Sequence, residues 1–213
     1  MLTRILSTKD RLAFQMAHAK ARDAVLNDLN CTFFACYEPL ICHSSAINRT
    51  TYLRRPDLGR RLRDPHLFQR GDYDAVIILA DGLSATAVHR HAGPVLDALL
   101  PWLEGWKLAR ICVAEQARVA IADEIGELLG AKMSVILIGE RPGLSSPDSL
   151  GAYLTWSPRV GRTDAERNCV SNIREDGLKP QLAAHRIAML MKVARGQRVT
   201  GVRLTGAMLL END

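Results

Sequence analysis

The sequence predicts an α/β fold with a parallel, Rossmann-like sheet that carries helices on both faces. From Asp74 onward, strand-like and helix-like segments alternate along the chain. The first of these strands, residues 75–80, is a continuous apolar run, which is typical of a strand buried on both faces. Two parallel strands are joined by a helix that runs back over one face of the sheet. The alternation therefore indicates right-handed crossovers, with helices covering both faces.

A small helical and extended segment precedes this sheet. Residues 7–29 carry alanines and larger apolar residues at helical spacing, with Ser7 or Thr8 suited to cap the helix. A short strand is expected at residues 40–42. We therefore divide the chain into residues 1–70, an N-terminal helix with an arginine-rich extended arm, and residues 71–213, the α/β domain.

The elements of the α/β domain follow from apolar periodicity and from glycine and proline positions. The expected strands are residues 75–80, 108–114, 133–138, 152–156 and 201–204, and the expected helices are residues 84–103, 121–129 and 180–195. Ser84 is placed to cap the first helix, Gly93-Pro94 to kink or split it, and Gly130 to end the second. Pro180 suits the first turn of the third helix.

Composition excludes several classes of protein. The 213 residues suffice for one sizeable core, and no apolar run approaches the roughly 20 residues that a membrane helix needs. The first residues do not form a signal peptide, so we expect a cytoplasmic protein. The five cysteines form no C-x-x-C pair, and we expect them to be reduced and mostly buried, without a zinc site.

The net charge of +5 is concentrated in residues 48–63, which contain six arginines and no lysine. Arginine without lysine suits bidentate pairing with carboxylates or phosphates at a defined surface. Three interpretations remain open, namely an interface with another protein, a solvated basic face and a nucleic-acid-binding surface. Tyr52 is the only aromatic residue in the segment, which weakens the third.

Three carboxylates, Asp81, Glu115 and Glu140, follow the three central strands and are expected at one edge of the sheet. Because carboxylates only accept hydrogen bonds, the group favours a ligand rich in donors. Each also has a structural interpretation: Asp81 in a turn, Glu115 paired with Arg118, and Glu140 paired with Arg141. No dinucleotide, Walker or hydrolase motif is present, and no complete acid–base set supports a stand-alone α/β enzyme.

Four long motifs together resemble a known family, the small subunit of adenosylcobalamin-dependent ethanolamine ammonia-lyase. They are YLRRPDLGRRL at residues 52–62, ADGLSATAV at 80–88, IGERPGL at 138–144 and RNCVSNIR at 167–174. DEIG at 123–126 and FQMAHA at 14–19 add weaker support. The resemblance extends from about residue 11 to residue 204, in the order of the family.

The resemblance implies a subunit of a lyase that converts ethanolamine to acetaldehyde and ammonia by radical chemistry. It implies adenosylcobalamin as cofactor, lying between this chain and a large subunit that holds the substrate and the catalytic residues. By motif position, the family's cobalamin contacts fall on Val119, Glu140 and Cys169. This makes residues 71–213 a cobalamin-binding domain with no catalytic residue and no metal ligand of its own. We expect a heteromeric complex in which this chain alone is inactive and which involves neither nucleic acid nor membrane.

Two departures from the family pattern concern the N-terminal part. The longer basic, glycine-containing segment that usually precedes the first helix is absent, and residues 29–43 are shorter and richer in cysteine. We expect both to affect contacts with the large subunit and packaging into an ethanolamine-utilisation microcompartment, the specialised cytoplasmic location that the resemblance suggests.

Overall fold

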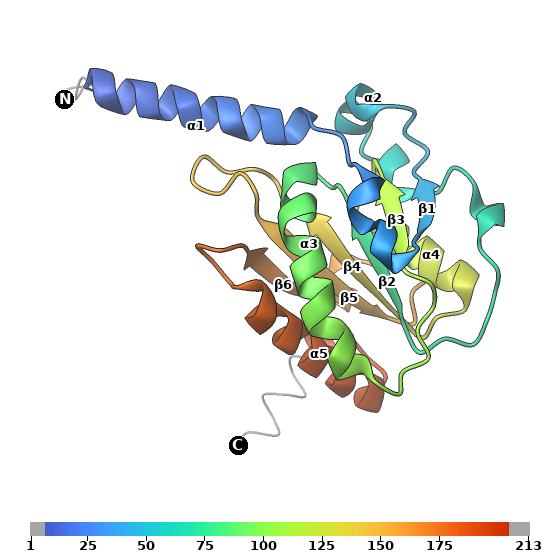
Figure 1. The fold of residues 1–213 in the computed structure, drawn as a ribbon. Helices are drawn as coiled ribbons and strands as arrows, with labels where there is room; N and C mark the ends of the chain where they lie inside the picture. The colour runs from blue at the N-terminus through green and yellow to red at the C-terminus, as the bar shows by residue number, and fades with distance from the viewer. Residues whose placement is uncertain (1–6, 205–213) are drawn as a thin grey trace.

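A computed structural model describes residues 7–204 and shows a six-stranded sheet flanked by helices (Figure 1). The order of the strands across the sheet is β1-β3-β2-β4-β5-β6. The strands are β1 (Leu40–His43), β2 (Val76–Ala80), β3 (Cys112–Glu115), β4 (Met133–Gly139), β5 (Leu150–Trp156) and β6 (Arg167–Ile173). The α/β class predicted from the sequence is confirmed, and the short strand expected at residues 40–42 is β1.

Five α-helices and several short 3₁₀ helices accompany these strands. The α-helices are α1 (Thr8–Leu26), α2 (Arg49–Arg54), α3 (Ala85–Leu99), α4 (Ile121–Leu129) and α5 (Pro180–Gln197). The 3₁₀ helices are η1 (Cys31–Tyr37), η2 (Leu58–Arg60), η3 (Pro65–Leu67), η4 (Leu100–Leu103) and η5 (Asp164–Glu166). None of the helices in residues 7–204 combines the length and apolarity that a bilayer crossing requires.

Several predicted helix ends are confirmed. The Ser7 and Ser84 side chains accept hydrogen bonds from main-chain N–H groups in the first turns of α1 and α3. Gly130 ends α4 with φ +70°, a conformation that costs glycine little. Of the kink or split expected at Gly93-Pro94, the split is wrong: α3 runs unbroken through Pro94, and its apolar side stays buried on the sheet.

The prediction of an all-parallel sheet is wrong in its second half. β1, β3, β2 and β4 are parallel, but β4 pairs with β5 and β5 with β6 in antiparallel register. A parallel neighbour would require a crossover, usually a helix, after β4, whereas residues 140–149 form only a loop. The short loop therefore turns the chain straight back on itself.

Two further features of the C-terminal end differ from the sequence analysis. Strand β6 was not expected, because only Val170 and Ile173 give it an apolar pattern. The strand expected at residues 201–204 is wrong: these residues form a turn followed by helical residues. Gly201 has φ +80°, and a side chain there would collide with the Ala165 carbonyl, so the chain turns at this point.

The core lies in two layers on either side of the sheet. One cluster packs α3 and α5 against the odd-numbered residues of β2 and β4, such as Ile77 and Val135. The other packs α4 and the arm residues Leu62 and Phe68 against the opposite face. On this second face Tyr153 of β5 is half-buried and Cys169 of β6 is exposed. The helical cover on the α4 side is therefore incomplete over β5 and β6.

The N-terminal residues surround one edge of this body. α1 projects away from the rest of the molecule (Figure 1), and Ala24 is its only fully buried residue. β1 lies within residues 1–70 yet pairs with β3, so this segment supplies an edge strand of the sheet. The five cysteines are free, but only Cys42 and Cys112 are buried, which corrects the expectation that most are.

Candidate functional site

Glu140 lies directly after β4, at the carboxyl edge where the sequence places it. Its Oε2 accepts hydrogen bonds from the Ser149 hydroxyl at 2.5 Å and from the Asn172 main-chain N–H at 3.3 Å. The Glu140 N–H donates to the Ser149 carbonyl at 2.9 Å, which closes the loop of residues 140–149. Its internal partners are thus Ser149 and Asn172, not Arg141. Within residues 7–204, Oε1 accepts no hydrogen bond and remains available to a ligand.

Cys169 and Tyr153 are register partners on β6 and β5 and carry side chains on the same face. The Tyr153 hydroxyl and the Cys169 thiol are close enough to affect each other's pKa. Desolvation raises the pKa of the Cys169 thiol, the neighbouring Tyr153 hydroxyl lowers it, and the nearby Glu140 carboxylate raises it, with a net upward shift. The thiol therefore stays protonated at neutral pH and is a poor nucleophile.

Val119 lies in the loop between β3 and α4. Its side chain is half-buried at the margin of the core cluster under α4, to which Tyr153 also belongs. It lines a cavity of about 440 Å³ together with Arg118 and Arg167, the first residue of β6. The structure therefore places Glu140 near Cys169, and Val119 on the same side of the sheet as both.

The first turn of α4 is fastened to the start of β6 by a buried ion pair. Both Nη atoms of Arg167 donate to the Asp123 carboxylate at 2.7 Å. Val119 lies two residues before the start of α4, and Cys169 lies two residues beyond Arg167. The ion pair thus holds Val119 and Cys169, two of the three predicted cofactor-binding residues, at a fixed separation.

Asp81 does not take part in this face, which corrects the hypothesis of three carboxylates around one ligand. It is fully buried and accepts hydrogen bonds from Arg49 at 2.9 Å and from the main-chain N–H groups of Gln116 and Ala117 at 3.0 and 2.9 Å. Glu115 is occupied by His43 at 3.2 Å and by the Cys31 thiol at 3.1 Å, not by Arg118. Of the three carboxylates, Glu140 alone remains a candidate.

Most of the arginine-rich segment is also engaged internally. Arg49 is buried on Asp81, Arg55 pairs with Asp57 at 2.7 Å, and Arg61 pairs with Glu124 at 3.1 Å. Arg63 donates to a main-chain carbonyl at 2.9 Å. Arg54 and Arg60 are exposed and have no carboxylate partner within residues 7–204. A docking role for this segment rests on these two side chains.

Sequence reasoning missed Tyr153, Ser149 and Asn172. Asn172 lies within a motif quoted for the family resemblance, but its main-chain contact with Glu140 follows from the unexpected strand β6. Tyr153 could have been noticed as a polar aromatic residue between the apolar residues Ala152 and Leu154 of the strand. Its position beside Cys169 depends on the antiparallel register, which the sequence did not indicate.

Comparisons with known proteins find one family model and several relatives that match most of the chain. The family model described as "Ethanolamine ammonia-lyase light chain" matches residues 2–205. The "Ethanolamine ammonia-lyase small subunit" of Azotobacter vinelandii is 54% identical, over 93% of this chain and 80% of its own length. The proteins of the same name from Pseudomonas syringae pv. tomato and Ralstonia nicotianae are 51% and 49% identical, over 93% and 95% of this chain and 75% and 81% of their own lengths.

Proposed function

The chain belongs to the ethanolamine ammonia-lyase light-chain family, and from this premise we propose that it caps adenosylcobalamin against the large subunit of that enzyme. The reaction proposed for the complex is the conversion of ethanolamine to acetaldehyde and ammonia. When bound, the cofactor supplies the radical that takes a hydrogen atom from the substrate. The contribution of this chain is to hold and shield one side of the cofactor.

The observation that carries the proposal is the partly uncovered face of β5 and β6. A face of a sheet that no helix covers leaves polar and apolar side chains open to a broad ligand. Here Glu140, Tyr153 and Cys169 lie on that side, and Val119 borders it next to α4. A corrin ring is a broad ligand of this kind, and needs contact over an area that a narrow cleft cannot offer.

The chemistry of these side chains fits the periphery of a corrin. Corrin rings carry amide groups whose N–H donors require acceptors, and Glu140 Oε1 is a free carboxylate acceptor. Val119 offers apolar contact, and the Tyr153 and Cys169 side chains are neutral and polar. In residues 7–204 no cluster of three or more histidine, cysteine or acidic side chains is arranged to hold a metal ion. We therefore expect these side chains to contact the periphery of the corrin ring.

In the part of the chain that the structure describes, the same face carries no complete set of groups that would catalyse the reaction alone. The Cys169 thiol is protonated, and Glu140 is fixed by Ser149 and Asn172 at the rim. Within residues 7–204, no histidine takes part in the hydrogen bonds of these residues. We therefore assign substrate binding and the acid–base groups to the large subunit, and expect no turnover by this chain alone.

The decisive experiment combines the purified chain with the large subunit from the same organism and follows aldehyde release after addition of adenosylcobalamin. We expect release only when both chains are present. Turnover by this chain alone, or undiminished turnover by the large subunit alone, would refute the proposal.

A variant pair tests the location of the cofactor. Cys169→Arg places a long cation on the proposed face, and should weaken cofactor binding by the complex by more than about tenfold through steric exclusion. Cys36→Arg is the matched control, since Cys36 is also exposed but lies in η1, near the opposite edge of the sheet. Equal effects of the two substitutions would contradict the assignment of this face.

A further inference from the structure

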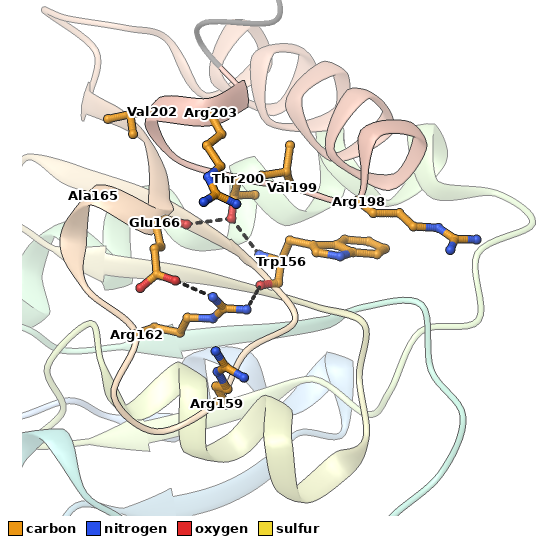
Figure 2. Close-up of a pocket in the computed structure, with 10 residues that line it drawn as sticks. All are labelled: Trp156, Arg159, Arg162, Ala165, Glu166, Arg198, Val199, Thr200, Val202 and Arg203. Carbon is orange, nitrogen blue, oxygen red and sulfur yellow. Dashed lines mark hydrogen bonds and ion pairs between the residues drawn. The ribbon is translucent and has the colours of Figure 1, made fainter.

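A second concave site lies at the other end of the strands: Glu140 follows the carboxyl end of β4, and this site lies near the amino end of β4. Trp156, at the end of β5, pairs with Met133, the first residue of β4, whereas Glu140 follows the last residue of β4. Around Trp156 the chain forms a pocket of about 470 Å³ (Figure 2). This volume lies within the range of about 300–1,000 Å³ that is usual for small-molecule sites.

The pocket is strongly cationic. Arg159, Arg162, Arg198 and Arg203 line it, with Glu166 as the only carboxylate among the lining residues. These five side chains carry a net charge of +3, more than half of the net charge of +5 of the whole chain. Like charges gathered in a concavity repel one another, and the walls focus their field on a ligand of opposite sign.

One of the four arginines is used to build the pocket. Arg162 pairs with Glu166, and its Nε and Nη2 atoms donate to the Ser157 carbonyl at 3.0 and 2.9 Å. Arg159, Arg198 and Arg203 are exposed and have no carboxylate partner within residues 7–204. In Figure 2 the Arg203 and Arg159 side chains approach Arg162 from opposite sides, while Arg198 lies beyond the Trp156 indole.

The segments that form the walls of the pocket are connected by hydrogen bonds, which hold them in place relative to one another. The main-chain N–H of Trp156 donates to the Thr200 hydroxyl at 2.8 Å, and this hydroxyl donates to the main-chain carbonyl of Glu166 at 2.6 Å. These bonds join the end of β5, η5 and the turn after α5. Arg159 and Arg203 therefore stand on two segments that are held at a fixed separation.

We propose that this pocket binds a small organic phosphate with at least two negative charges, whose phosphate groups lie between Arg159 and Arg203. Guanidinium groups match phosphate oxygens in geometry and remain charged at every physiological pH. The Trp156 indole forms an aromatic wall beside the cations, suited to the organic part of the ligand. A nucleic acid would instead need a basic stripe longer than this enclosed space.

The test uses the full chain and two probes, pyrophosphate and ADP, with binding followed by calorimetry and by tryptophan fluorescence. We expect saturable binding of both probes, competition between them, and a rise in melting temperature with ligand concentration. Arg159→Gln and Arg203→Gln should each weaken both probes by about tenfold, since each removes one charged contact. Trp156→Leu should weaken ADP more than pyrophosphate.

The matched control is Arg186→Gln, which removes an exposed arginine on α5 that does not line this pocket. Equal weakening by Arg186→Gln and Arg159→Gln would show an adventitious, non-specific anion effect and overturn the proposal. Binding of pyrophosphate without ADP would exclude the organic class. Unchanged probe binding in Arg159→Gln and Arg203→Gln, with weakened assembly with the large subunit, would assign these cations to a protein contact.

Discussion

Arg167, the first residue of β6, holds the carboxylate of Asp123 in the first turn of α4 through two hydrogen bonds of 2.7 Å. The two side chains are 2% and 1% exposed, so the ion pair is removed from water. Arg167 also donates to the Thr155 hydroxyl at 2.9 Å and to the Arg162 carbonyl at 3.0 Å. The pair thus links the two elements that border the proposed cofactor face.

Arg167→Met should destabilise the chain by about 3–5 kcal/mol, because it leaves the Asp123 carboxylate buried without a counter-charge. The free energy of unfolding in urea at neutral pH measures this loss. Asp164→Asn is the control: Asp164 lies 3.5 Å from Arg167 Nε but is fully exposed, so its removal should cost no more than about 1 kcal/mol.

The double variant Asp123→Leu/Arg167→Met separates two causes of the loss. It removes both charges and fills the space with apolar atoms, so it should regain most of the stability lost in Arg167→Met. If the double variant is no more stable than Arg167→Met, the loss comes from packing and not from an unpaired buried charge.

Glu166 makes the stability of the folded chain depend on pH in the acid range. Hydrogen bonds from the Thr163 main chain and from Arg162 lower its pKa to about 2, from an ordinary value of 4.5. A lowered folded-state pKa means that the stabilisation is complete above about pH 4.5 and is lost as the pH falls toward 2. Glu166→Gln should therefore be less stable than the parent chain at about pH 6, with the difference shrinking steadily below about pH 4.5.

Urea unfolding of the two proteins across this pH range measures the difference. Glu175→Gln is the control, since Glu175 is exposed and forms no ion pair within residues 7–204. A stability difference between the parent chain and Glu166→Gln that is the same at pH 6 and at about pH 3 would contradict the role given to the charge.

The parallel half of the fold could be predicted because its signals are local. The fully buried strand β2, the Ser84 cap of α3 and the Gly130 end of α4 each follow from a few neighbouring residues. The direction of β5 could not be predicted this way, since it depends on the loop at residues 140–149 having no crossover helix. An edge strand such as β6 pairs through its main chain and needs little apolar pattern.

The candidate site was predictable only in part for the same reason. Position after a strand was enough to place Glu140 at the carboxyl edge, and the family motifs nominated Val119 and Cys169. Position could not show that Asp81 is occupied by Arg49 and by two main-chain N–H groups, because these contacts join residues 32 to 36 positions apart. Nor could it show Tyr153 beside Cys169, which requires the antiparallel register.

Glu140→Gln should weaken adenosylcobalamin binding by the assembled enzyme by about 10- to 150-fold, corresponding to about 1.5–3 kcal/mol for one hydrogen bond to a charged group. The substrate KM should hardly change at saturating cofactor, because the proposal places the substrate on the other subunit. Cofactor titration and thermal unfolding of the same complex measure the two effects.

Ser149→Ala is the control for Glu140, because it removes an internal partner of the carboxylate and leaves its charge in place. We expect it to lower the melting temperature while cofactor affinity changes much less than in Glu140→Gln. An unchanged cofactor constant in Glu140→Gln, beside a lowered melting temperature, would assign Glu140 to the stability of the loop and remove it from the site.

Arg54→Glu should weaken assembly with the large subunit, because Arg54 is one of the two arginines of residues 48–63 that have no carboxylate partner within residues 7–204. Reversing one charge at a docking surface introduces repulsion as well as removing attraction, so we expect at least a tenfold loss of affinity, or about 1.4 kcal/mol. Arg55→Gln is the control, since Arg55 is held by Asp57 at 2.7 Å and has less freedom to pair with another chain.

Analytical ultracentrifugation of the mixed subunits gives the affinities, and a duplex-binding titration at physiological salt tests the nucleic-acid alternative. Non-specific phosphate contacts weaken steeply with salt, so weak duplex binding that disappears at physiological salt agrees with a protein partner. Tight duplex binding at that salt, together with unchanged subunit assembly in Arg54→Glu, would instead assign the arm to nucleic acid.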